Sequence, residues 1–219
     1  MNILVTGATG LVGAEVIREA MKDNQVTRIT ALARRPPALQ HSKLETIIHK
    51  DFNDYSNLHE VIKQHDAFLW CLGVSQSQVN KEQYHVITYD YALAAAKAVQ
   101  QVNPSMTFLF VSGEGADQTE KSRTLFARIK GKTENALLRL GMQKLYIVRP
   151  GGIKPINKNP NAPFIYKLFI PLFPLLEALR PSSVINSVQL AKAMLEIVKT
   201  YPDKPIFENV ELKQIAATL

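Results

Sequence analysis

The sequence of 219 residues has a single cysteine, Cys71, so no disulfide bond can form within the chain. Proteins without disulfides are typical of reducing compartments, and we therefore expect a cytoplasmic protein. Cys71 lies in the apolar run AFLWCLG, which favours a buried thiol over a reactive nucleophile. The N-terminal residues MNILVTG show no basic region followed by a long apolar region, so we expect no secretory signal.

The sequence also lacks residues that are spaced like metal ligands. The five histidines are not spaced like zinc ligands, and no cysteine or acidic cluster completes a site, so a metal enzyme is not expected. Dense blocks of Lys and Arg are absent too, although the net charge is +7. A positive charge suits phosphorylated cofactors, acidic membranes or nucleic acid without choosing among them. Because the basic residues are scattered, we expect no nucleic-acid partner.

Strongly apolar sequence is limited to one long segment, FIYKLFIPLFPLLEALR (Phe164–Arg180), which Pro171 and Pro174 interrupt. A membrane-spanning helix needs about 20 apolar residues, so this segment is too short and too broken to span a bilayer. It is either a lid packed over a substrate cleft or a surface that contacts a membrane or another subunit. We favour the lid, and we treat residues 154–186 as a substrate-side lid or contact region. The sequence is also compatible with a homodimer.

What the sequence does contain is a regular alternation of β-rich runs and helical stretches. Alternation of this kind predicts an α/β domain with a parallel sheet covered by helices, here a single domain over residues 1–219. The predicted strands are 2–6, 27–34, 44–51, 66–73, 106–112 and 144–152. The predicted helices are 11–22, 57–64, 81–101, 124–140 and 188–201, with Ser187 as the cap of the last, followed by a short strand and a small helix.

The first strand runs directly into TGATGLVGAEV, where Gly7, Gly10 and Gly13 are spaced three residues apart. In a strand–turn–helix unit the first glycine permits the tight turn and the second lets the backbone approach a pyrophosphate. The third lets the helix pack closely on the strand. Free N–H groups and the helix dipole then hold the anion. We therefore predict a dinucleotide on this turn, bound by the three glycines and by Thr9, Leu11 and Val12.

The end of the second predicted strand indicates which dinucleotide. A cofactor with a free ribose 2′-hydroxyl usually meets an acidic residue there, but the sequence reads ALARRPP, with Arg34 and Arg35 and no acid nearby. Guanidinium groups bind a 2′-phosphate through charge-assisted hydrogen bonds. We therefore favour NADP over NAD, with two solvated surface arginines as the alternative.

The stretch TLFARIKGKT (Thr124–Thr133) ends in a Gly-Lys-Thr triplet like that of a phosphate-binding loop. That interpretation fails, because no glycine stands five residues before Gly131 and no strand precedes the segment.

Taken together, TGATGLVG, KDF (50–52), CLG (71–73), VSGEGAD (111–117), FARIKGKTE (126–134) and IVRPGGI (147–153) resemble the atypical short-chain dehydrogenase/reductase family. The resemblance is to its small single-domain branch of Tat-interacting-protein-like and NmrA-like NAD(P)-binding proteins. It covers residues 1–153 in order and the remainder more loosely. It implies a Rossmann-type, doubly wound parallel sheet with helices on both faces and a small C-terminal helical extension.

The resemblance also implies roles for particular residues. It places Asp51 and Phe52 near the adenine and Leu72 and Gly73 along a ribose. Pro150 and Gly151 would contact the nicotinamide end. Active members of the family use a serine and a Tyr-x-x-x-Lys pair, in which the tyrosine transfers the proton. Ser112 and Lys130 match the serine and the lysine, and Phe126 stands at the tyrosine position.

The missing hydroxyl leaves two classes of function open, because a phenyl ring cannot exchange a proton. One is an NADP-dependent oxidoreductase or epimerase-like enzyme that acts on an unknown small molecule with a substitute for the tyrosine. The other is a nucleotide-sensing or regulatory module without chemistry. Glu114 and Asp117 follow Ser112 closely and are candidate substitutes, although we favour a polar, solvated loop for both.

Overall fold

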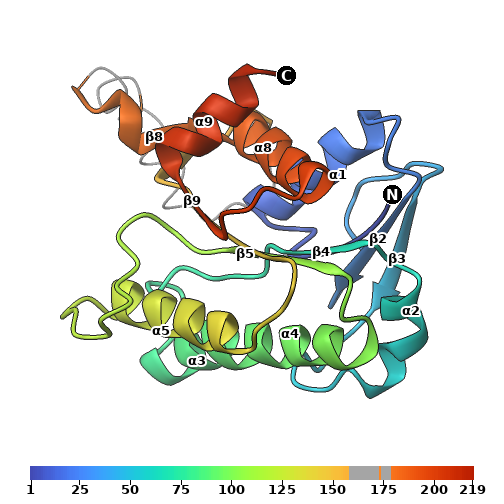
Figure 1. Cartoon of the computed structure of the whole chain (residues 1–219), viewed down its shortest axis with the longest axis horizontal. Coiled ribbons are helices and arrows are strands. Elements are labelled where there is room, and N and C mark those ends of the chain that lie inside the picture. Colours follow the sequence, from blue (N-terminus) through green and yellow to red (C-terminus); the bar gives the residue numbers. More distant parts are fainter. Residues whose placement is uncertain (158–172, 174–178) are drawn as a thin grey trace.

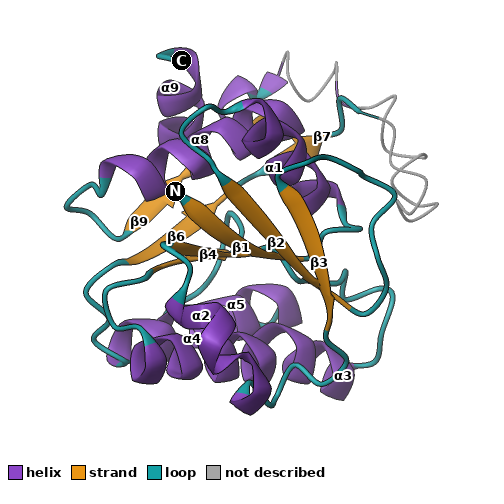
Figure 2. Cartoon of the chain, turned by 90° about the vertical axis from the view of Figure 1, so that its right-hand side faces the viewer, coloured by secondary structure: helices purple, strands orange, loops and turns teal. Residues whose placement is uncertain are grey.

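The computed structural model describes residues 1–157, 173 and 179–219. Within these residues, seven parallel strands form one sheet in the order β3-β2-β1-β4-β5-β6-β9 (Figure 2). The strands are β1 (Asn2–Thr6), β2 (Arg28–Ala33), β3 (Leu44–Ile48), β4 (Ala67–Trp70), β5 (Thr107–Val111), β6 (Leu145–Arg149) and β9 (Ile206–Glu208). A separate parallel pair joins β7 (Gly152–Lys154) to β8 (Val184–Asn186).

Helices cover both faces of the sheet (Figure 1). On one face lie α1 (Leu11–Lys22), α8 (Ser187–Thr200) and α9 (Asn209–Ala217). On the other lie α2 (His59–Lys63), α3 (Lys81–His85), α4 (Tyr91–Val102) and α5 (Leu125–Arg139). Short 3-10 turns occupy Ser56–Leu58 and Pro181–Ser183. The predicted doubly wound Rossmann-type sheet is confirmed.

Two details of the predicted helices differ in the structure. The predicted helix 81–101 is helical throughout, but a π-helical turn at Val86–Asp90 separates α3 from α4. Asn186 rather than Ser187 caps α8, because its side chain accepts a hydrogen bond from the Gln189 amide in a capping box. The Ser187 hydroxyl instead lies 3.4 Å from a carboxylate oxygen of buried Glu15 on α1.

Alternation along the buried strands divides the core into two layers. Ile3 and Val5 of β1 face α1 and α8, whereas Leu4 faces the opposite layer with Phe68 and Phe108. In the second layer Ala92, Ala95 and Ala96 of α4 are fully buried, and their small side chains leave room for this aromatic cluster. A parallel sheet buried on both faces explains the continuous apolar runs of its strands.

Across the described part of the chain, no helix is both long and apolar enough to cross a membrane. The predicted lid at Phe164–Arg180 lies outside the described residues except for Phe173, Leu179 and Arg180.

Candidate functional site

The turn between β1 and α1 depends on two glycines. Gly7 has a φ of +69°, and a Cβ there would lie 2.5 Å from the Cys71 carbonyl oxygen. A Cβ on Gly13 would lie 2.3 Å from the Gly7 carbonyl oxygen. Any side chain at either position would collide with main chain that cannot move aside. This turn therefore has the close backbone packing predicted from the glycine spacing.

The N-terminus of α1 lacks a side-chain cap. Gly10 is the N-cap residue, and the first turn of α1 contains no acidic residue. The Gly10 N–H donates to the Gly7 carbonyl oxygen at 2.8 Å, and this bond closes the turn that precedes α1. A helix N-terminus without a cap offers N–H groups and the positive end of the dipole to an anion. The turn thus fits the pyrophosphate of a dinucleotide.

A cavity of about 420 Å³ opens at this turn, where the strand order reverses between β1 and β4. We call it the glycine-turn cavity, and its walls are Gly7, Ala8, Thr9, Leu32, Ala33, Arg34, Arg35, Phe52 and Leu72. Ligands of doubly wound sheets bind in the crevice at this reversal. The predicted residues Thr9, Arg34, Arg35, Phe52 and Leu72 come together here.

Other predicted cofactor residues lie outside the walls of the glycine-turn cavity. Leu11, Val12 and Gly73 are absent from its lining, as is Asp51. The exposed Asp51 carboxylate accepts a hydrogen bond from the Asn53 amide at 2.9 Å, so it is directed to its own loop.

Thr6 is a structural residue of the site that the motifs did not reveal. It is fully buried, and its hydroxyl accepts hydrogen bonds from the amides of Cys71 and Leu72, both at 3.1 Å. These bonds hold the chain that leaves β4 against the end of β1, and so position Leu72 over the glycine turn. Its only sequence signal is its place directly before Gly7.

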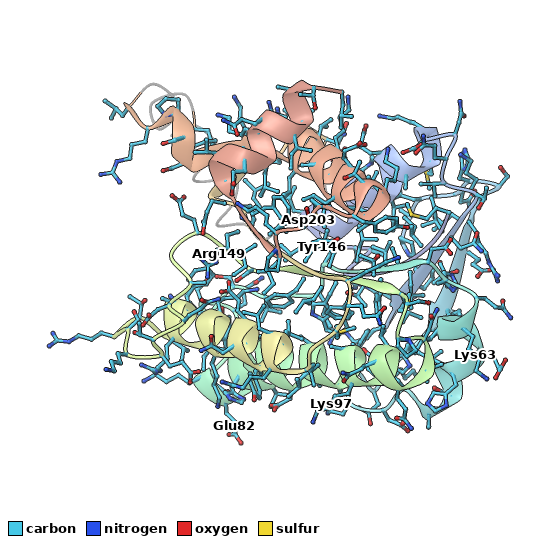
Figure 3. All side chains as sticks on the ribbon, in the orientation of Figure 1. Lys63, Glu82, Lys97, Tyr146, Arg149 and Asp203 are labelled. Carbon is cyan, nitrogen blue, oxygen red and sulfur yellow. The ribbon has the colours of Figure 1, made fainter. Side chains whose placement is uncertain are left out.

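Ser112 follows β5 and is buried, with its hydroxyl donating to the Glu134 carboxylate at 2.5 Å. Glu134 is fully buried and also accepts hydrogen bonds from the Gln118 amide and, twice, from the Arg149 guanidinium. The hydrogen bonds to Glu134 raise the pKa of Arg149, which also pairs with Glu208. Figure 3 labels Arg149 between the two helical layers. The predicted catalytic serine therefore belongs to a buried ionic network.

Lys130 also points into the protein. Its ammonium group donates to the Val111 carbonyl oxygen at 2.8 Å and lies 4.7 Å from the centre of the Phe110 ring. Burial lowers its pKa from 10.5 to about 8, and the nearby Glu134 carboxylate opposes this shift.

Phe126 lies one helical turn before Lys130 and packs against the loop after β5. A Cβ on Gly113 would lie 2.6 Å from Cζ at the tip of the Phe126 ring. The ring forms part of a second cavity of about 500 Å³, the Phe126 cavity, lined by Glu114, Gly115, Phe126, Pro150, Gly151, Gly152, Arg180, Ser183 and Val184. Three residues of the predicted catalytic end, Phe126, Pro150 and Gly151, meet here, whereas Ser112 and Lys130 are not part of its walls.

The glycine of the Gly-Lys-Thr triplet has a packing role. Gly131 lies in the middle of α5, and a Cβ there would lie 1.8 Å from the Asp117 carbonyl oxygen. The amide of Asp117 also donates to the Ala127 carbonyl oxygen at 2.9 Å. Gly131 therefore lets the loop after β5 rest directly on α5, which agrees with the rejection of a phosphate-binding loop.

The two candidate substitutes for the tyrosine have different surroundings. The Asp117 carboxylate accepts hydrogen bonds from Thr119, Lys121 and Ser122. These bonds, led by the Thr119 hydroxyl, lower the pKa of Asp117, so this side chain organises its loop. Glu114 instead lines the Phe126 cavity.

Comparison with known proteins decides the family. The model of a family described as NAD(P)H-binding matches residues 7–164, which include the glycine turn and Lys130. The chain belongs to this NAD(P)H-binding family. The predicted resemblance to atypical short-chain dehydrogenases/reductases is thereby confirmed, and the chain is an NAD(P)-binding protein of that type that takes a nicotinamide dinucleotide.

Two curated relatives match more than two thirds of the chain. The FMP52 protein of Candida albicans is 32% identical over 168 residues, which cover 74% of this chain and 71% of that protein. The fmp52 protein of Emericella nidulans is 30% identical over 68% of this chain and 66% of its own length.

Solved structures share the fold at low sequence identity. UDP-glucose 4-epimerase from Thermotoga maritima aligns with a TM-score of 0.71 and 12% identity over all of this chain and 82% of the enzyme. Vestitone reductase from alfalfa aligns with a TM-score of 0.70 and 16% identity over 94% of this chain and 76% of the enzyme.

The predicted cytoplasmic location is wrong. The FMP52 relatives from Candida albicans, Emericella nidulans and Meyerozyma guilliermondii are all named as mitochondrial proteins. The prediction failed because a chain with one cysteine has no internal disulfide in any compartment, so cysteine content cannot separate cytoplasm from mitochondrion.

Proposed function

We propose that the chain is an NADP-dependent oxidoreductase or epimerase-like enzyme with an altered active site. The observation that supports it most directly is the composition of the glycine-turn cavity. Arg34 and Arg35 both stand in its wall, and no carboxylate is among the described residues that line it. A carboxylate there would repel a 2′-phosphate, whereas guanidinium groups bind it.

Each part of the dinucleotide has a matching group in the chain. The Gly7–Gly13 turn and the N-terminus of α1 hold the pyrophosphate, and Arg34 and Arg35 bind the 2′-phosphate. Phe52 and Leu72 form the apolar wall for the adenosine. When bound, the cofactor supplies hydride chemistry, and the Phe126 cavity at the ends of β5 and β6 receives the substrate.

A second candidate function is a nucleotide-sensing or regulatory module. The internal contacts of Ser112 and Lys130 favour it. The Ser112 hydroxyl donates to Glu134 and the Lys130 ammonium donates to the Val111 carbonyl oxygen, and neither residue lines the Phe126 cavity. Both candidates require tight cofactor binding, and they differ only in whether a substrate is turned over.

Two measurements test the proposal. Fluorescence titration should show tighter binding of NADPH than of NADH by the parent protein. Exchange of both Arg34 and Arg35 for alanine should remove that preference, at a cost of roughly 1–3 kcal/mol. Arg139→Ala, an exposed arginine at the far end of α5, is the matched control and should bind like the parent.

Equal affinity of the parent for NADPH and NADH would contradict the NADP assignment. NADPH oxidation over a panel of aldehydes, ketones and quinones then separates the two candidates. Tight binding without turnover of any compound would leave the regulatory module.

A further inference from the structure

We propose that Glu114 makes the proton transfer that the absent tyrosine hydroxyl cannot make, so that it is a catalytic residue of the Phe126 cavity. This inference rests on the proposed oxidoreductase function.

The main chain holds Glu114 at the end of the sheet. It follows β5 by three residues, and its amide donates to the Pro150 carbonyl oxygen at 2.8 Å. This bond ties the loop after β5 to the chain that leaves β6. A residue at this edge of a doubly wound sheet lies where ligands bind, beside the strand ends.

The side chain of Glu114 reaches over Gly151. A Cβ on Gly151 would lie 2.6 Å from a Glu114 carboxylate oxygen and 2.2 Å from the Ser183 carbonyl oxygen. The other carboxylate oxygen lies 3.4 Å from the Ser183 hydroxyl. Glycine at position 151 therefore makes room for the carboxylate above the backbone that the family resemblance assigns to the nicotinamide end.

The Phe126 cavity offers few other groups that exchange protons. The Arg180 guanidinium has hydrogen-bond donors and no acceptor, and the Ser183 hydroxyl donates toward Glu114. The Phe126 ring has no exchangeable proton. Of the described residues that line this cavity, Glu114 is the sole carboxylate.

A residue that transfers protons in every cycle must also be able to exchange them with water. The side chain is solvent-exposed, so a proton that it accepts can leave to water. Asp117, the other candidate, has its carboxylate occupied by hydrogen bonds within its own loop. Ser112 and Lys130 are likewise occupied, as described above.

In the oxidative direction the O–H bond of an alcohol breaks and its proton passes to the Glu114 carboxylate. The carbon gives up a hydride to the oxidised nicotinamide dinucleotide, so the alcohol becomes a carbonyl compound and the cofactor is reduced. The carboxylic acid of Glu114 then releases its proton to solvent. In the reductive direction each transfer is reversed.

The test compares Glu114→Gln with the parent in NADPH binding and in steady-state kinetics. The amide keeps the size of the side chain and an acceptor for Ser183, so the fold and the NADPH dissociation constant should be unchanged. The kcat for the best panel substrate should fall about 100-fold or more, with little change in KM, because positioned proton transfer contributes about 10²–10⁴-fold. Glu114→Asp should retain part of the activity.

Glu82→Gln is the matched control. Glu82 is an exposed carboxylate on the outer side of α3, remote from the sheet edge (Figure 3), and its loss should change neither binding nor kcat.

The outcomes separate the two proposals. If the parent turns over a substrate and Glu114→Gln does so equally fast, the role of Glu114 is overturned and the oxidoreductase function stands. If the parent binds NADPH but turns over no compound of the panel, both are overturned. A Glu114→Gln variant that loses NADPH affinity in parallel with kcat would make Glu114 a binding residue and would also overturn the proposal.

Discussion

The two ends of the site differ in where their polar groups point. At the glycine turn, the N-terminus of α1 has no side-chain cap, and Arg34 and Arg35 line an open cavity. At the family's catalytic position, Ser112 and Lys130 are bound inward, to Glu134 and to the Val111 carbonyl oxygen. Phe126, which stands at the tyrosine position according to the family resemblance, packs its ring against Gly113.

The proposed binding end and the proposed catalytic end therefore lie in separate parts of the fold. The binding end is built from backbone geometry over a few consecutive residues, so it survives as long as its glycines do. The catalytic end depends on side chains from β5, α5 and β6 that also stabilise the protein. Ser112 and Lys130, to which the family resemblance assigns catalytic roles, make internal structural contacts in this protein.

The largest expected effect is on stability at the catalytic end. Glu134→Gln removes the charge that Arg149 and Ser112 contact, and breaking a buried ion pair costs about 3 kcal/mol or more of the free energy of unfolding. Urea unfolding measures the loss. Glu60→Gln, which removes an exposed ion pair with Lys63, should leave the urea midpoint unchanged. An equally small change for both would mean that the Glu134 network is not structural.

Gly10→Val tests the binding end. A Cβ at Gly10 would lie 3.2 Å from the Gly7 carbonyl oxygen, a contact that a small shift relieves, so the fold should survive. The branched side chain would occupy the space of the pyrophosphate and weaken NADPH binding about 100-fold or more.

Gly152→Ala is its control at the other end of the site. A Cβ there meets the Phe173 ring at an ordinary 3.5 Å, and NADPH affinity should be retained. A folded Gly10→Val protein that binds like the parent would place the cofactor away from the turn.

Phe126→Tyr tests the proposed catalytic end of the site. It adds a hydroxyl at the ring tip, beside Gly113. We expect a gain in NADPH oxidation of at least about tenfold toward some aldehyde, ketone or quinone. Phe126→Leu is the control and should show no gain. If tyrosine adds nothing while NADPH still binds, position 126 does not face the reacting group.

A further difference between the two ends is the pH dependence of stability that comes from Lys130. Its pKa falls from 10.5 to about 8 in the folded protein, so between these values the unfolded chain binds more protons. Stability therefore rises with pH across this window, by on the order of 1–3 kcal/mol, and is independent of this group at lower pH. Lys130→Met should abolish the rise in urea midpoints between pH 8 and 10, and exposed Lys97→Met should retain it. A parent protein with a flat profile would contradict a buried Lys130.

The sequence anticipated the parts of the site that depend on local pattern. The glycine spacing after β1 and the arginine pair after β2 predicted the walls of the glycine-turn cavity. Phe52 and Leu72 came from the family motifs, and the structure places both in the same walls. Parallel strands bring their carboxyl ends to one edge, so residues that follow successive strands meet there.

The parts that were not anticipated depend on contacts between distant residues. The Ser112–Glu134 hydrogen bond joins residues 22 positions apart, and Glu134 appears in the sequence as an ordinary charge on a helix. Asp51 matched its motif, but its carboxylate bonds within its own loop. The prediction of a cytoplasmic location failed for another reason, because the number of cysteines does not determine the cellular compartment.

By itself the sequence determined the fold class, the glycine turn and the absence of an exchangeable proton on the Phe126 side chain. Strand–helix alternation, the lack of a side chain on glycine and the chemistry of a phenyl ring are all local properties. Only the tertiary structure decided that Ser112 and Lys130 face the interior, that Gly131 serves packing, and that Glu114 lines the Phe126 cavity while Asp117 does not. Each of these depends on which groups approach from other strands and helices, and burial and hydrogen bonding then decide which polar groups remain free to act.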